Sequence, residues 1–60
     1  MSKMREERQR RGWSLTYVTT LTGIATTDLS AIERGLRPAW PGWRRRVARA
    51  FGVTVEELFG

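Results

Sequence analysis

The stretch LTYVTTLTGIATTDLSAIER, residues 15–34, decides how this 60-residue chain is organised. Apolar residues recur at helical spacing on both sides of its glycine: Leu15, Val18 and Leu21, with Thr22 as a further candidate, before it, and Ile24, Leu29 and Ile32 after it. Glycine tolerates the positive φ that often ends a helix, so Gly23 predicts a tight corner between two short helices. On spacing alone, the pattern fits the middle of a small helical bundle equally well.

The helix after the corner, residues 26–34, has a clear spacing and a poor cap. Ile24 and Leu29 are placed to pack on one another as a hydrophobic staple around an N-cap at Ala25. Ala25 has no side-chain acceptor, so either Thr26 serves as the cap or the first N–H groups of this helix remain exposed.

The two helices upstream of the corner begin at better caps. Ser14 can cap the helix of residues 15–22, and Trp13 is placed to pack on the core. Ser2 can cap a first helix that runs to about residue 11. That helix is mostly charged, and we expect it to bury Met4 and to gain support from two ion pairs, Glu7 with Arg11 and Glu6 with Arg10.

Two more helices are predicted downstream. Residues 36–42 contain both prolines and form a loop, in which Trp40 either covers the core or lies exposed as a partner contact. Pro41 fits the first turn of the next helix, whose apolar face is Trp43, Val47, Ala50 and Phe51. The last helix begins with a capping box at Thr54 and Glu57, and it is so short that it must dock or be shared with a second subunit.

Length and composition restrict the class of protein. Sixty residues form one domain, 1–60, near the lower limit for folding without disulfides or metal. The absence of Cys and His excludes a disulfide framework, a zinc finger and imidazole catalysis, and no nucleophile–base pair is evident. We therefore expect no enzyme, no metal and no cofactor. No apolar run approaches the ~20 residues of a membrane span, which favours a cytoplasmic protein with no membrane partner.

The charge balance indicates the kind of partner. Eleven Lys and Arg oppose six Asp and Glu, for a formal net charge of +5, and ten of the eleven cations are Arg. Such an excess favours a polyanion, because each neutralised phosphate releases condensed counterions and because guanidinium binds phosphate bidentately. Nucleic acid ranks first, a merely solvated basic face second and anionic lipid third.

Four segments together resemble one family. GWSLTYV at residues 12–18, the Gly23–Ile24 pair, LSAIERG at residues 29–35 and VARAFGVTVEELF at residues 47–59 resemble the small helix-turn-helix domains of the phage lambda repressor and Cro type, the XRE-like family. The match covers nearly the whole chain. It implies an all-α, compact five-helix domain with the helix-turn-helix at about residues 15–34, whose helix 26–34 enters the major groove of double-stranded DNA.

The resemblance also implies roles for individual residues. The base-facing positions are Thr26, Thr27, Ser30 and Ala31. The phosphate positions are Ser14 and Leu15, through backbone N–H groups at a helix start, together with Arg34 and Arg37; Leu15 stands where the family often has Gln, which predicts a weaker anchor. Arg8 and Glu33 match an internal ion pair of relatives, and the candidate dimer contacts are Val55, Leu58, Phe59 and Trp40.

Two positions depart from the family pattern. Thr19 and Thr22 stand where smaller or apolar residues are usual, and we expect the fold to accept both because a Thr hydroxyl can bond back to a carbonyl one turn earlier. None of the base-facing residues is Arg, Asn or Gln, so discrimination between sequences leans on methyl contact, DNA shape and dimer spacing.

The sequence thus predicts a sequence-specific DNA-binding regulator of transcription, a repressor, acting as a homodimer on a two-fold site and associated with the nucleoid when bound. No small-molecule effector is expected in so small a domain. The alternative is a protein-binding module, such as the antitoxin of a toxin–antitoxin pair or an oligomerisation subunit, in which DNA binding is secondary.

Overall fold

Five helices follow one another along the chain, and the part that the computed structural model describes, residues 2–60, contains no strand. They are α1 (Lys3–Arg10), α2 (Leu15–Thr22), α3 (Thr26–Glu33), α4 (Pro41–Phe51) and α5 (Val55–Phe59). The all-α, five-helix architecture expected from the resemblance is therefore confirmed. Within residues 2–60, no helix is both long enough and apolar enough to cross a bilayer.

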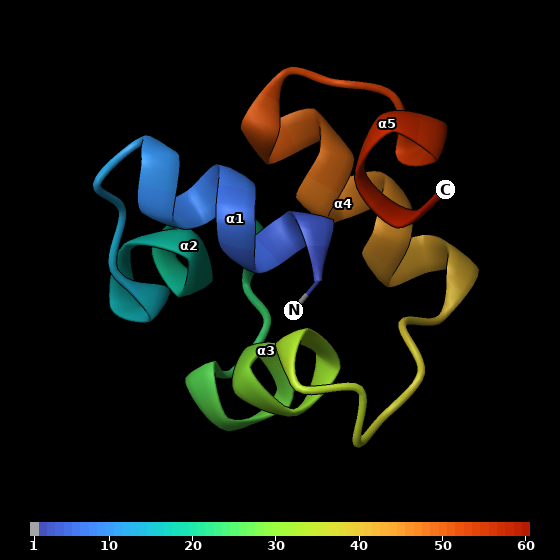
Figure 1. The fold of residues 1–60 in the computed structure, drawn as a ribbon. Coiled ribbons are helices and arrows are strands. Elements are labelled where there is room, and N and C mark those ends of the chain that lie inside the picture. The colour runs from blue at the N-terminus through green and yellow to red at the C-terminus, as the bar shows by residue number, and fades with distance from the viewer. Residues whose placement is uncertain (1) are drawn as a thin grey trace.

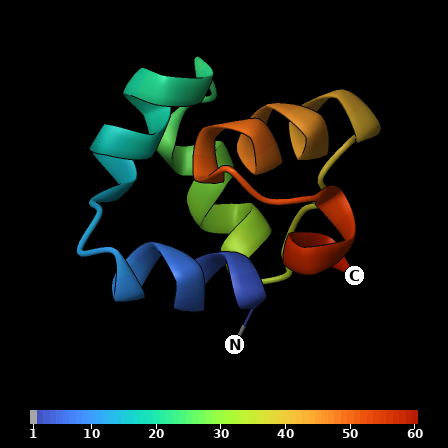
Figure 2. The same ribbon diagram turned by 90° about the horizontal axis from the view of Figure 1, so that it is seen from above.

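The helices pack around one core, with α3 on the outside. α2 packs against α3 and α4, while α5 packs against α1 and α4. Figure 1 shows α3 along the lower edge of the molecule, away from α5. In the perpendicular view of Figure 2, α2 and α4 lie along one side and α1 along the other.

Every helix contributes to this core. The most deeply buried side chain of each is Met4, Val18, Leu29, Val47 and Leu58, and each of these is at most 2% exposed. Burial of a leucine of this kind contributes about 1.5–3 kcal/mol, which a five-residue helix could not obtain from its own hydrogen bonds. Helix α5 is thus held by docking on its own chain.

The apolar face of α4 is close to the prediction, and the helix begins at Pro41, one residue before the predicted end of the loop. Pro41 occupies the first turn as expected, with Trp40 as an N-cap that makes no side-chain cap bond. Val47 and Phe51 are buried, and Ala48, which the spacing argument left out, is buried with them.

Of the two neighbouring candidates for the buried face of α2, Leu21 was wrong and Thr22, the further candidate, is the buried one. Leu21 is 42% exposed, whereas Thr22 is 9% exposed and lies one turn after the fully buried Val18. The Thr22 hydroxyl donates to the Val18 carbonyl at 2.8 Å and accepts from the Ile24 N–H at 3.2 Å, so a polar group is accommodated in the core without an unpaired atom. Thr19 behaves differently, because its buried Oγ1 has no hydrogen-bond partner among residues 2–60.

The charged face of α1 is organised around one carboxylate. The expected pair of Glu7 with Arg11 is present at 2.7 Å, but Arg10 also turns to Glu7 at 2.7 Å and does not pair with Glu6. Arg11 in addition donates to the Phe51 carbonyl at 2.9 Å, which ties the end of α1 to the end of α4.

This cluster predicts a pH dependence of stability. The hydrogen bond from Arg10, reinforced by Arg11 and opposed by desolvation, holds the pKa of Glu7 below its ordinary value. A carboxylate with a lowered pKa stabilises the fold above the ordinary glutamate pKa, and that contribution disappears as the pH falls. We expect the thermal midpoint of the wild type to fall more steeply than that of Glu7→Gln between about pH 5 and pH 3. Parallel curves would remove Glu7 from the acid response.

Candidate nucleic-acid interface

The corner between α2 and α3 is formed by Gly23. Its φ of 77° and ψ of 7° lie in the left-handed region, and its N–H donates to the Thr19 carbonyl at 2.8 Å, closing α2. α3 then begins at Thr26. Ile24 and Leu29, the two residues of the expected staple, are both buried in the core and hold the start of α3 against it. The helix-turn-helix is thus built from short-range features of the sequence.

The start of α2 leaves backbone donors available at the surface. Ser14 is the N-cap, and its hydroxyl accepts from the Tyr17 N–H at 3.0 Å. One hydroxyl cannot satisfy all the N–H groups of a helix start, so the others remain free for an external acceptor. The Leu15 side chain packs against the core, which leaves the backbone as the polar part of this residue.

The start of α3 also leaves backbone N–H groups without a partner, and more of them than the start of α2 does. Its N-cap is Ala25, with no side-chain cap bond, so the second of the two predicted alternatives is the observed one. The only acidic residue in the first turn is Asp28. Its carboxylate offsets part of the partial positive charge of the helix N-terminus, about half an elementary charge, while the first N–H groups themselves have no side-chain cap.

The outward face of α3 and the start of α2 meet at one shallow, open depression. Thr27 is exposed, while Thr26, Ser30 and Ala31 are partly exposed. The depression brings together three of the four predicted base-facing residues and two of the phosphate candidates, although not Ala31; it is lined by Leu15, Thr26, Thr27, Ser30 and Arg34. Hydroxyl groups, methyl groups and one guanidinium are thus presented side by side.

The two arginines after α3 differ in their surroundings. Arg34 is the C-cap of α3, is exposed, and has no carboxylate partner among residues 2–60. Arg37 is half-exposed, with its Nε 3.7 Å from Asp28 Oδ1. Such a surface pair is worth about 0–1 kcal/mol and does not prevent Arg37 from turning to a phosphate.

The ion pair that the resemblance implied is present. Arg8 donates from Nε and Nη2 to the two carboxylate oxygens of Glu33 at 2.7 and 3.1 Å, and from Nη1 to the Trp13 carbonyl at 2.8 Å. The Glu33 side chain is only 4% exposed, and its hydrogen bond raises the pKa of Arg8 despite desolvation. The pair fixes α1 against α3 and so sets the position of the helix-turn-helix in the molecule.

The predicted dimer contacts do not all lie at the surface. Leu58 is buried at 2% exposure in the core of a single chain, so it is removed from the set of possible contacts. Val55 and Phe59 are partly exposed, and Trp40 is 56% exposed, which excludes the alternative that it covers the core. Leu36, for which no role was predicted, is 68% exposed on the same loop as Trp40.

No role was predicted for Arg5, a partly exposed cation of α1 that has no carboxylate partner among residues 2–60. It lies in the charged run of residues 5–11, for which two ion pairs were predicted, neither of them involving Arg5. Whether an arginine in such a run has a carboxylate partner depends on the neighbouring helices, and no signal in the sequence alone identifies the one that lacks it.

Comparison with known proteins agrees with this geometry. A family model described as a helix-turn-helix domain matches residues 2–58. The comparisons with curated proteins and with solved structures gave no match.

Proposed function

Because the chain belongs to the helix-turn-helix domain family of the Cro and XRE type, we propose that it binds double-stranded DNA sequence-specifically and represses transcription. The observation that carries the proposal is the open depression at which the outward face of α3 meets the start of α2. It combines a helix start without a side-chain cap, small polar side chains and an exposed arginine. An anionic groove with hydrogen-bonding base edges is the surface that this combination fits.

In the proposed complex α3 lies in the major groove. The hydroxyls of Thr26, Thr27 and Ser30 bond to base edges, and the threonine methyls and Ala31 contact thymine methyls. These contacts discriminate less than the bidentate ones that Arg, Asn or Gln make, so the shape of the DNA contributes a large share of specificity.

Backbone phosphates flank this helix. The N–H groups at the start of α2, around Ser14 and Leu15, take one phosphate, and Arg34 and Arg37 take others.

Replacing Arg34 or Arg37 with alanine is expected to weaken binding to all sequences and to reduce the slope of log K against log salt by about one. The measurement is a titration of fluorescent duplex over a salt series. An unchanged slope in both variants would exclude these arginines from the interface.

A homodimer on a two-fold site completes the proposal. Trp40, Val55 and Phe59 are the contacts that remain after Leu58 is excluded, and they occupy the loop after α3 and the last helix. Two α3 helices then enter successive major grooves, about 34 Å apart on one side of the duplex.

The test is selection of bound sequences from a random duplex pool at two salt concentrations. Enrichment of a palindrome is expected, and the distance between its half-sites gives the separation of the two α3 helices. Salt-sensitive binding without an enriched sequence would exclude sequence-specific regulation and leave a non-specific DNA binder.

A second candidate function is favoured by one observation. Leu36 and Trp40 expose large apolar side chains on a single loop, which is typical of a contact with another protein. The protein would then be a protein-binding module, such as an antitoxin, in which DNA binding is secondary. An apolar interface persists at moderate salt, whereas electrostatic DNA binding collapses. Absence of DNA binding at both salt concentrations would make the protein-binding module the preferred function.

A further inference from the structure

The four arginines of α1 and its C-cap, residues 5–11, differ in whether they have a carboxylate partner. Arg8 is paired with Glu33, and both Arg10 and Arg11 are paired with Glu7. Arg5 has no carboxylate within 4 Å among residues 2–60. Its charge is therefore not neutralised by the part of the chain that the structure describes.

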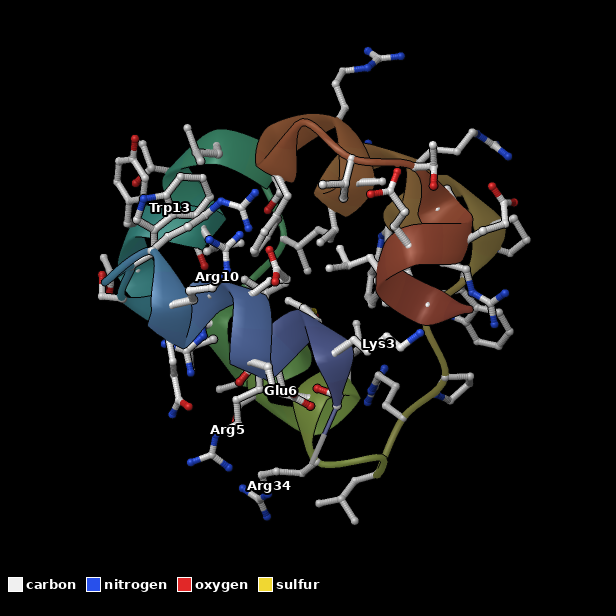
Figure 3. The ribbon with its side chains drawn as sticks, turned by 45° about the horizontal axis from the view of Figure 1, so that its top comes forward. Lys3, Arg5, Glu6, Arg10, Trp13 and Arg34 are labelled. Atoms are coloured by element: carbon white, nitrogen blue, oxygen red, sulfur yellow. The ribbon has the colours of Figure 1, made fainter. Side chains whose placement is uncertain are left out.

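Arg5 lies next to the end of α3. It is three residues before Arg8, so both side chains leave the same side of α1, and the Arg8–Glu33 pair holds that side against α3. Figure 3 shows Arg5 and Arg34 extending on the same side of the molecule, one from α1 and one from the end of α3. Both line one open depression, together with Ser2 and Gly35.

The acid nearest to this depression does not neutralise the two arginines. Glu33 also lines it, but both of its carboxylate oxygens accept from Arg8, at 2.7 and 3.1 Å. Two guanidinium groups on one depression repel each other unless an anion lies between them. An anion that accepts hydrogen bonds is thus the ligand that the charges favour.

The guanidinium of Arg5 is also not fully hydrogen-bonded. Its Nε is buried and has no acceptor among residues 2–60. Buried donors are normally paired, so this one indicates a group that is not committed to a protein acceptor. Phosphate oxygens accept two parallel N–H bonds from a guanidinium, and no acceptor among residues 2–60 competes for this Nε.

We propose that Arg5 and Arg34 together hold one phosphate of the DNA backbone beside the groove that α3 enters. This inference rests on the proposed DNA-binding function and extends the interface from the helix-turn-helix to α1. The Arg8–Glu33 pair fixes α1 against α3 and so brings together the two segments from which Arg5 and Arg34 extend.

The experiment is a fluorescence-anisotropy titration of a random-sequence duplex of about 20 base pairs, two helical turns, over a salt series. The variants are Arg5→Gln, Arg34→Gln and the double variant. Arg45→Gln is the matched control, because Arg45 is an exposed arginine on α4 without a carboxylate partner in the described chain. Loss of a charge-assisted contact is expected to weaken binding about tenfold in each single variant.

Sharing of one phosphate gives a further expectation. The double variant should bind more tightly than the product of the two single losses implies, and its salt slope should be about one unit shallower than that of the wild type. Arg5→Lys keeps the charge without the fork of donors, so it should bind with an affinity between those of the wild type and Arg5→Gln. Circular dichroism confirms that each variant is folded.

The failures of the two proposals can be told apart. If the wild type binds the duplex, Arg34→Gln weakens binding and Arg5→Gln behaves like Arg45→Gln, the phosphate site at Arg5 is wrong and the DNA-binding function stands. If the wild type does not bind duplex DNA at any salt concentration, both proposals fall. Fully additive losses would show that the two arginines act on separate phosphates and would overturn the shared site.

Discussion

Replacement of Glu33 with alanine is expected to lower the free energy of unfolding by about 3–5 kcal/mol, because it leaves the guanidinium of Arg8 buried without its counter-ion. The Glu33 side chain is 4% exposed and the Arg8 side chain 13%, so water cannot compensate for the loss. A domain of this size has about 3–5 kcal/mol of stability in total. Most of the Glu33→Ala protein should therefore be unfolded at room temperature, as measured by helical circular dichroism and urea titration.

The control for this prediction removes both charges. The double variant Arg8→Met, Glu33→Leu keeps the volume of the pair and leaves no buried charge, so it should fold with a stability close to that of the wild type. A Glu33→Ala protein with an unchanged urea midpoint would show that the pair contributes nothing to holding α1 against α3.

Replacement of Thr27 with aspartate is expected to change stability and DNA affinity in opposite directions. Thr27 is exposed in the first turn of α3, which has no side-chain cap, and a carboxylate there interacts favourably with the helix dipole by about 0.3–1 kcal/mol. In the proposed complex the same carboxylate would enter the anionic major groove, where base-edge acceptors and the flanking phosphates repel it. Like charges in an interface cost several kcal/mol, so the affinity should fall by about 100-fold or more.

Gln9→Glu is the matched control for this second prediction. Gln9 is exposed on α1, and its replacement lowers the net charge by one, as Thr27→Asp does, without placing an acid on α3. Thermal unfolding and duplex titration of both variants separate the two effects. Equal, small losses of affinity in both would mean that α3 does not enter the groove and would favour the protein-binding alternative.

The elements that the sequence predicted well are those set by neighbouring residues. The capping box of Thr54 and Glu57 is present with both of its hydrogen bonds, and Gly23 ends α2 where the pattern placed it. Caps and helix ends depend on residues three or four positions apart, which a single sequence contains. The helix bounds were accordingly close to those observed.

The errors occur where packing between helices decides which residue is buried. Leu21 and Thr22 are adjacent, and the docking of α2 on α3 and α4 selects which of them is buried; the selection can favour Thr22 because its hydroxyl is satisfied inside the helix. Leu58 is an apolar residue of the last helix and was predicted to be a dimer contact. It is buried instead, because α5 packs on α1 and α4. The unpartnered state of Arg5 depends on the same kind of long-range information.

For the candidate interface, the sequence predicted which residues belong to it better than it predicted which of them lie side by side. Thr26, Thr27, Ser30 and Arg34 were identified from the resemblance, and the structure brings them to one depression with Leu15. The contacts of these residues with DNA remain predictions. The second depression, where Arg5 meets Arg34, joins segments far apart in the chain and could not be anticipated from spacing.

The packing of α5 on α1 also determines how the molecule opens. Because the first and last helices lie against each other, and α5 places Leu58 in the common core, neither helix can detach without exposing that core to water. Fraying from the two ends is therefore coupled to global unfolding. The hydrogen-bonded amide protons of α1 and α5 should then exchange with solvent as slowly as those of α2 and α4. The α3 helix is presented by a scaffold that behaves as a single cooperative unit.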